Sequence, residues 1–96
     1  SIIMPFAHIH DYVMISMGVK IAHHTVLRKA SFISTGANIG ANIDFGEYAF
    51  AGIGSTVTTG VKKIGNNAII GAGAVIIRDV SEDAVVVGNP GRILEK

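Results

Sequence analysis

Two adjacent histidines, His23 and His24, are the side chains of this sequence best suited to chemistry near neutral pH. They interrupt the segment IAHHTV, which otherwise alternates apolar and small residues. An imidazole with an ordinary pKa of about 6.5 can accept a proton from an amine or a hydroxyl near neutral pH. The pair is a candidate general base, although metal ligands and solvated turn residues are alternatives that this segment alone leaves open.

A metal site needs more ligands than this pair provides. The other two histidines, His8 and His10, could share one face of a strand, but two imidazoles alone make a weak site and the chain has no cysteine. Neighbouring residues point to opposite sides of an extended chain, so we expect the side chains of His23 and His24 to diverge. The sequence therefore predicts no bound metal.

Composition excludes several classes of function. The net charge is +1 without a basic run, so we expect no nucleic-acid partner. No apolar run approaches the roughly 18 residues of a membrane span, and no cysteine is available for disulfides, which predicts a cytoplasmic protein without membrane contact. A chain of 96 residues that is 49% hydrophobic should bury surface in an oligomer. Because it opens at Ser1 rather than methionine, we expect a fragment.

A six-residue repeat organises almost the whole chain. Mostly large apolar residues recur every six positions, and small or β-branched residues dominate a second series four positions after each of them. After one extra residue, placed at Lys63, the same pattern resumes. The leading residues of the thirteen hexads are Ile3, Ile9, Ile15, Ile21, Leu27, Ile33, Ile39, Phe45, Ala51, Val57, Ile64, Ile70 and Ile76.

This period excludes a helix and favours short strands joined by corners. Six residues rotate a helix by about 600°, which would scatter the apolar positions over several faces. In a unit made of a strand and a corner, the leading aliphatic side chain points inward and a small residue fits the corner. Glycines such as Gly40 and Gly71 permit close approach of backbones, and others permit positive φ at bends. The sequence therefore predicts an all-β parallel solenoid.

The hexads IGNNAI at 64–69 and IGAGAV at 70–75 resemble those of the hexapeptide-repeat family. The resemblance implies a single-stranded, left-handed parallel β-helix with three hexads in each triangular coil. Thirteen hexads then give about four coils in a domain at 1–82, followed by a short C-terminal tail at 83–96. The handedness comes from the resemblance, because spacing alone does not determine it.

The tail sequence VVVGNPGRI at 85–93 resembles the ending of coenzyme A-dependent acetyltransferases of this family, with Gly91 where alanine is usual. The resemblance implies an enzyme with acetyl-CoA as acetyl donor, in which Arg92 offers a forked donor to a phosphate. It also implies that the backbone N–H near Ala41 supports the developing oxyanion. The remaining cofactor-binding residues implied in this way are Gly54, Ala72 and Gly88.

The order of residues from HHTVLRKASFIS at 23–34 onward is most similar to bacterial acetyltransferases of nucleotide-aminosugars and sialic acid. This similarity implies transfer of acetyl to an amino or hydroxyl group of a sugar or nucleotide-sugar in glycan synthesis, with His23 as general base. In those enzymes an acidic residue often follows the base and a second histidine lies nine positions after it, where this chain has His24 and Phe32. His24 is therefore the second catalytic candidate. The same enzymes carry an N-terminal Rossmann-like sugar-binding domain, which we expect this fragment to lack.

These two departures leave another function open. A catalytically inactive or structural trimerisation module would keep the repeat without the catalytic side chains. A metal protein like the γ-carbonic anhydrases is a weaker alternative, because the four histidines of the chain include no His-x4-His pair.

The outward residues of the hexads predict a homotrimer. Sorting the residue before each leading aliphatic by face gives three columns, of which one is wholly apolar. Each of its side chains would contribute roughly 1.5–3 kcal/mol if removed from water, so we expect this column at the interface and the histidine corner to be completed by a neighbouring subunit. The apolar column is Met14, Phe32, Phe50 and Ile69; the others are His8, Val26, Asp44 and Lys62, and Lys20, Asn38, Thr56 and Val75.

Overall fold

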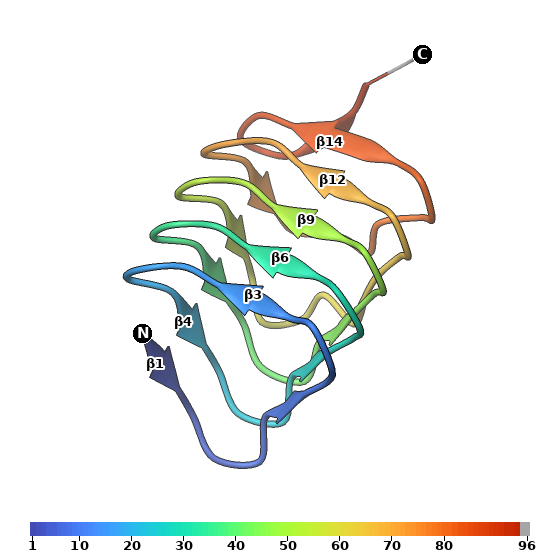
Figure 1. Cartoon of the computed structure of the whole chain (residues 1–96). Coiled ribbons are helices and arrows are strands. Elements are labelled where there is room, and N and C mark those ends of the chain that lie inside the picture. Colours follow the sequence, from blue (N-terminus) through green and yellow to red (C-terminus); the bar gives the residue numbers. More distant parts are fainter. Residues whose placement is uncertain (95–96) are drawn as a thin grey trace.

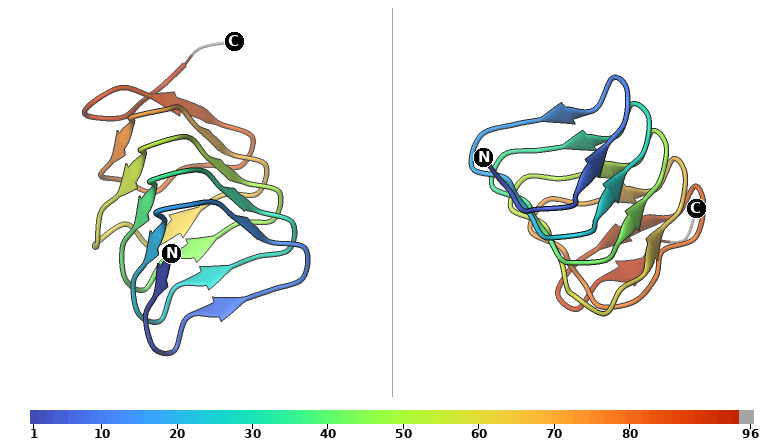
Figure 2. Two further views of the ribbon diagram at one scale, coloured as in Figure 1. Left: turned by 60° about the vertical axis from the view of Figure 1, so that its left-hand side comes forward. Right: turned by 90° about the horizontal axis from the view of Figure 1, so that it is seen from below.

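The computed structural model describes residues 1–94 as a triangular stack of very short strands (Figure 1). Viewed from its N-terminal end, the chain turns anticlockwise as it recedes from the viewer, which makes the coil left-handed (Figure 2). The predicted left-handed parallel β-helix is therefore confirmed. Within residues 1–94 no helix is long and apolar enough to cross a membrane. The last two residues of the predicted tail, 95 and 96, lie outside the described part of the chain.

Three sheets form the sides of the triangle. Sheet A contains β1 (Ile2–Ile3), β4 (Lys20–Ile21), β7 (Asn38–Ile39), β10 (Thr56–Val57) and β13 (Val75–Ile76). Sheet B contains β2 (His8–Ile9), β5 (Val26–Leu27), β8 (Asp44–Phe45) and β11 (Lys63–Ile64). Sheet C contains β3 (Met14–Ile15), β6 (Phe32–Ile33), β9 (Phe50–Ala51), β12 (Ile69–Ile70) and β14 (Val85–Val87), and β15 (Arg92–Ile93) pairs antiparallel with β14.

Successive coils are in strict register, three hexads apart. Lys20 pairs with Asn38 and Asn38 with Thr56, a step of eighteen residues each time. The next step, from Thr56 to Val75, is nineteen residues because it contains the extra residue. The predicted columns on sheets A and C are thus confirmed.

The predicted column on sheet B is wrong in one position. Lys63, not Lys62, pairs with Asp44. The extra residue is absorbed in the bend before Lys63, where Thr59 and Val61 form an isolated bridge, so Lys63 takes the strand position directly before Ile64. The ladder above the insertion therefore keeps its register.

The leading aliphatic residues fill the interior as predicted. Ile21, Ile39 and Val57 stack on one another behind sheet A and are almost fully buried. The second series lies at the inner corners. There the buried hydroxyl of Thr25 donates a hydrogen bond of 2.6 Å to the carbonyl of Gly40, whereas the buried hydroxyls of Ser31 and Ser55 have no hydrogen-bond partner within residues 1–94.

The two ends of the stack differ. At the C-terminal end, β14 continues the parallel ladder to Val87, beyond the range 1–82, so the chain makes nearly five turns rather than about four. The β14–β15 hairpin then folds over this end, with the N–H of Gly91 donating to the carbonyl of Val75 at 2.7 Å. At the N-terminal end, Ile3 and Ile9 occupy inward positions but remain 47% and 40% exposed.

Replacing Ile39 by aspartate should unfold the β-helix. Ile39 is 2% exposed and stacks between Ile21 and Val57, so an unpaired carboxylate there would cost several kcal/mol. We expect Ile39→Asp to lose the β-type circular-dichroism spectrum at 25 °C. The control is Asn38→Asp, one residue away with its side chain directed outward, which should retain it. A folded Ile39→Asp protein would contradict the predicted core.

Candidate active site

The site residues predicted from sequence lie on two of the three edges of the triangular coil. One edge joins sheet A to sheet B and is called here the histidine edge; it carries Phe6, His24, Asn42 and Gly60, all with positive φ. The other joins sheet C to sheet A and is called the glycine edge; its positive-φ residues are Gly18, Gly36, Gly54, Gly73 and Gly88. Sheet A is the side of the triangle that separates these two edges.

The two histidines converge rather than diverge. Their Nδ1 atoms lie 3.0 Å apart and their rings are nearly perpendicular, with centroids 5.2 Å apart. The expected divergence was wrong because it assumed extended backbone, whereas His24 has a φ of 59° at the bend. A hydrogen bond between two Nδ1 atoms requires one of them to carry hydrogen and the other to be unprotonated.

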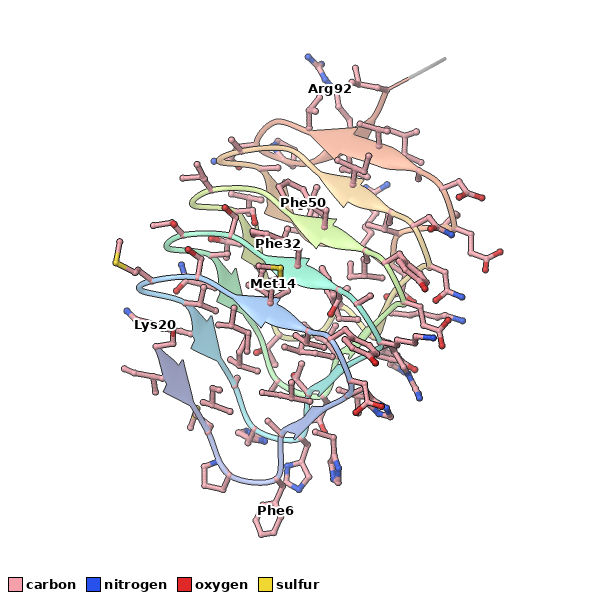
Figure 3. All side chains as sticks on the ribbon, viewed as in Figure 1. Phe6, Met14, Lys20, Phe32, Phe50 and Arg92 are labelled. Carbon is pink, nitrogen blue, oxygen red and sulfur yellow. The ribbon has the colours of Figure 1, made fainter. Side chains whose placement is uncertain are left out.

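His24 is also held from the coil below. Its ring stacks on that of Phe6, with centroids 5.0 Å apart and an angle of 16° between the planes. Phe6 lies at the N-terminal end of the molecule (Figure 3) and precedes His24 by three hexads. The main chain adds two contacts between coils: His24 N–H donates to the carbonyl of Pro5 at 3.4 Å, and Asn42 N–H to that of His23 at 3.1 Å. The imidazole pair is thus anchored on both sides.

Ala41 lies on the histidine edge, one coil above His23. Its backbone N–H, which the resemblance assigned to an oxyanion, already donates to the hydroxyl of Thr59 at 3.1 Å. Thr59 would have to rotate before this N–H could serve a ligand.

The glycine edge offers an unobstructed backbone. A Cβ atom added at Gly54 or Gly73 would meet nothing within 4 Å, so no side chain stands over these bends. Gly54 donates its own N–H to the carbonyl of Thr35 at 2.9 Å, so this residue offers open space rather than a free donor. Ala72 directly precedes Gly73, and Gly88 occupies the last bend of the same edge. Gly54, Ala72 and Gly88 are therefore brought together along one line.

Arg92 lies in a polar pocket of about 400 Å³ at the C-terminal end, together with Arg78, Asn89 and Gly88. Two guanidinium groups at one pocket suit a phosphate-bearing ligand. Sequence reasoning missed Arg78, which follows β13 at the last bend of the histidine edge and meets Arg92 through the return of the chain in β15. A Cβ at Gly91 would lie 2.8 Å from Cδ1 of Ile76 and 3.0 Å from the carbonyl oxygen of Val75, so these neighbours would have to shift to accept a side chain there.

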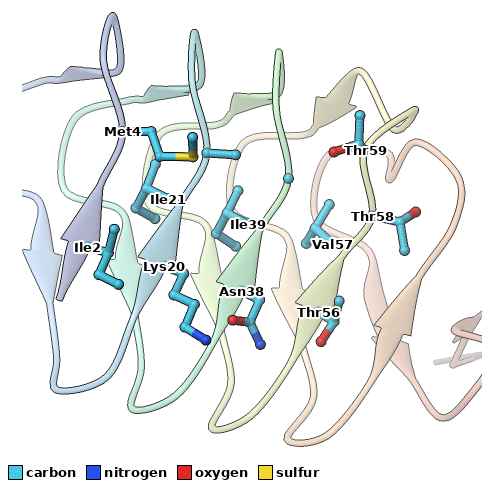
Figure 4. Close-up of a pocket in the computed structure, with 12 residues that line it drawn as sticks. Ile2, Met4, Lys20, Ile21, Asn38, Ile39, Thr56, Val57, Thr58 and Thr59 are labelled. Atoms are coloured by element: carbon cyan, nitrogen blue, oxygen red, sulfur yellow. The ribbon is translucent and has the colours of Figure 1, made fainter.

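A shallow groove runs along sheet A from β1 to β10, beside the histidine edge (Figure 4). Its floor is apolar near Ala22 and Gly40, where small residues hollow the surface, and Met4 stands at one end. Polar side chains line it as well: Lys20, Asn38, Thr56, Thr58 and Thr59. Ala22, which lines the groove, directly precedes His23 in the chain, although neither histidine side chain lines the groove itself.

The apolar column lies on sheet C, as expected, but not beside the histidines. Met14, Phe32 and Phe50 stand one above another on this face (Figure 3), and the rings of Phe32 and Phe50 are 5.4 Å apart. The histidine edge joins sheets A and B and is therefore the edge opposite sheet C. Completion of the histidine corner would therefore need another subunit's surface than the apolar column of the same chain, and it stays a prediction.

Across residues 1–94, no group of three or more histidine, aspartate or glutamate side chains is arranged to hold a metal ion. His23 and His24 are close enough to share a hydrogen bond, but no third ligand of these types joins them.

Comparisons with known proteins agree with this geometry. The sequence matches no family model. It is 31% identical over 96 residues to the serine acetyltransferase of Synechococcus elongatus, an alignment that covers 92% of this chain and 32% of that relative. The chain therefore spans about a third of the length of this curated relative.

Two solved structures are similar as well. Soybean serine acetyltransferase matches with a TM-score of 0.86 and 26% identity, over 93% of this chain and 40% of the soybean chain. A variant of the GDP-perosamine N-acetyltransferase of Caulobacter crescentus, in complex with CoA and GDP-perosamine, matches with a TM-score of 0.66 and 25% identity, over 100% of this chain and 58% of that one. With the left-handed coil and its six-residue repeat, these matches show that the homologues of this chain are acetyltransferases of the hexapeptide-repeat family.

Proposed function

We propose that this chain is the β-helical part of an acetyl-CoA-dependent acetyltransferase that acts on an amino or hydroxyl group of a sugar or nucleotide-sugar. The proposal rests on the positions of two groups of side chains, the imidazole pair and the two arginines of the C-terminal pocket. The imidazole pair lies in the second coil, and the pocket of Arg78 and Arg92 lies at the C-terminal end, three coil spacings higher. At about 4.8 Å for each coil, the separation along the axis of the stack is about 14 Å.

Coenzyme A fits residues placed in this way, because it carries phosphates at one end of a long flexible arm and its thioester at the other. Arg78 and Arg92 would hold the phosphates through forked hydrogen bonds. The open bends of the glycine edge would admit the arm without steric conflict. Because sheet A separates this edge from the histidine edge of the same chain, an arm in this position would meet the histidine edge of a neighbouring subunit. The thioester supplies an activated acetyl group, and His23 would remove the proton of the attacking amine or hydroxyl.

The groove on sheet A supports a sugar as acceptor. Its apolar floor suits the C–H face of a pyranose, and Asn38 and Thr56 offer amide and hydroxyl partners to sugar hydroxyls. The hydroxyl of Thr58 already donates to the carbonyl of Ile76 at 3.1 Å, so it could only accept. Lys20 adds a positive charge that favours an acceptor bearing phosphate or carboxylate. The GDP-perosamine bound to the Caulobacter relative is an acceptor of this class.

Sheet C supports a homotrimer. Its column Met14, Phe32, Phe50 and Ile69 is extended upward by Val85, which pairs with Ile69. Met14 and Ile69 are 59% and 44% exposed, so the single chain leaves much of this stripe in water. The glycine edge borders sheet C, and we propose that the cofactor arm lies close to the boundary between subunits.

Removing the guanidinium of Arg92 should weaken binding of acetyl-CoA. Loss of a charged hydrogen-bond partner costs about 1.5–3 kcal/mol, so we expect Arg92→Ala to raise the Kd by roughly 10- to 100-fold in calorimetry. The matched control is Arg28→Ala, whose guanidinium lies on sheet B and pairs with Asp44 at 2.9 Å. Equal Kd values for the two variants would contradict the phosphate pocket. No binding by the unaltered chain would favour a structural module.

Removing the imidazole of His23 should abolish most acetyl transfer. General-base catalysis contributes about 10²–10⁴-fold, so His23→Ala should lower kcat by that factor while acetyl-CoA binding is retained. Release of the CoA thiol, followed with amino sugars and nucleotide-sugars as acceptors, measures this rate. His8→Ala, on sheet B, is the control and should keep the full rate. An active enzyme that is indifferent to His23→Ala would exclude this residue as the base.

A charge in the apolar column should dissociate the assembly. Phe50 is 36% exposed in the single chain and contacts Phe32, so Phe50→Asp places a carboxylate in the proposed interface. We expect a trimer for the unaltered chain and a monomer of 10.0 kDa for the variant in sedimentation. Thr56→Asp, on sheet A, should leave the assembly intact. A stable monomer of the unaltered chain at micromolar concentration would contradict the interface.

A further inference from the structure

We propose that His24 is a positioning residue for His23, and that Phe6 positions His24 in turn, so that a neutral imidazole orients the base. The proposal deepens the proposed function and rests on it for the role of His23. It starts from two observed contacts, the 3.0 Å separation of the two Nδ1 atoms and the stack of Phe6 on His24.

The Nδ1 contact can exist in two forms. If His23 Nδ1 carries the hydrogen and donates, the Nε2 of His23 keeps its lone pair and can accept a proton. If His24 donates instead, Nε2 of neutral His23 carries the hydrogen and cannot act as a base. Only the first form makes His23 a base, and it requires His24 to be the tautomer with hydrogen on Nε2.

The rings of His23 and His24 have different surroundings. His23 follows Ala22, a residue of the groove on sheet A, whereas the ring of His24 lies against Phe6 in the coil below. The positive φ of His24 turns its side chain toward both partners. His23 is therefore next in the chain to a residue of the groove, and the ring of His24 has protein contacts on two sides.

The reaction then balances at His23 alone. Its Nε2 takes the proton from the amine or hydroxyl of the acceptor as that atom bonds to the acetyl carbonyl carbon. The carbon–sulfur bond of the thioester breaks, and the same proton passes from Nε2 to the leaving sulfur. His23 Nδ1–H stays bonded to His24 throughout, so His24 moves no proton. A neutral acceptor supports the transient imidazolium less strongly than a carboxylate would.

The tautomers can be measured in the isolated chain without substrate. Long-range proton–nitrogen NMR of the nitrogen-15-labelled chain should show hydrogen on Nδ1 of His23 and on Nε2 of His24. Phe6→Ala should return both rings to a mixture of tautomers. The matched control is Tyr12→Ala, because Tyr12 is an exposed aromatic residue of the same coil at an equivalent bend, with a φ of 61° against 64° for Phe6. The opposite tautomers, or rings indifferent to Phe6→Ala, would overturn the proposal.

Kinetics provide an independent readout. With acetyl-CoA and a sugar acceptor, Phe6→Ala and His24→Ala should each lower kcat roughly threefold to tenfold, the effect of one neutral hydrogen bond, and leave KM for acetyl-CoA unchanged. His24→Asp, which offers a charged acceptor, should restore kcat to at least the original value. A further loss of activity in His24→Asp would contradict the positioning role. An inactive unaltered chain would instead count against the proposed function, and the NMR measurement would still decide the arrangement of the pair.

Discussion

The hydrogen-bond ladder between successive coils is the constraint on which the rest of this structure depends. It fixes residues eighteen apart above one another, as Lys20, Asn38 and Thr56 are, so each position in the hexad becomes a column along the molecule. Backbones approach so closely that a Cβ at Gly46 would lie 2.6 Å from the carbonyl carbon of Gly65. A side chain at this glycine would require the neighbouring coil to shift, and the same holds for Gly40, Gly52 and Gly65.

Because of the same ladder, the side chains that could do chemistry lie at the bends rather than in the strands. Strands of two residues direct their leading side chain into the core, and their outer positions belong to flat columns. Within residues 1–94, positive φ occurs at the bends alone, where it directs neighbouring side chains in ways that a strand does not allow. Glycine at one edge removes side chains from the surface, while His24 at another brings its ring to His23. The two edges thus offer space for a ligand and a basic group for its chemistry.

Much of the fold follows from the sequence because the period of six leaves little freedom. The inward ranks, the columns on sheets A and C, and the left-handed coil implied by the resemblance all follow from the hexads and their family. Side-chain geometry within a bend does not, since the convergence of His23 and His24 depends on the φ of a single residue. The contact between Phe6 and His24 was predictable, because the eighteen residues between them make one coil and place one above the other. No sequence pattern predicts that Arg78 and Arg92 share a pocket, because it is the antiparallel pairing of β15 with β14 that brings Arg92 to Arg78.

The three sheets have different surfaces, although the same six-residue repeat builds all of them. Sheet C is apolar, sheet A is grooved, and sheet B is charged: there the hydrogen bonds of Arg28 lower the pKa of Asp44, although both side chains are too exposed for the pair to add much stability. Such a division requires the columns to stay aligned from one end to the other. The extra residue before Lys63 lies between the coil of His23 and the pocket of Arg92, and it would rotate every column above it by one position if it entered a strand. Because the bend absorbs the extra residue, Val75 still stacks on Thr56. The coil of His23 and the pocket of Arg92 therefore keep the same register of columns.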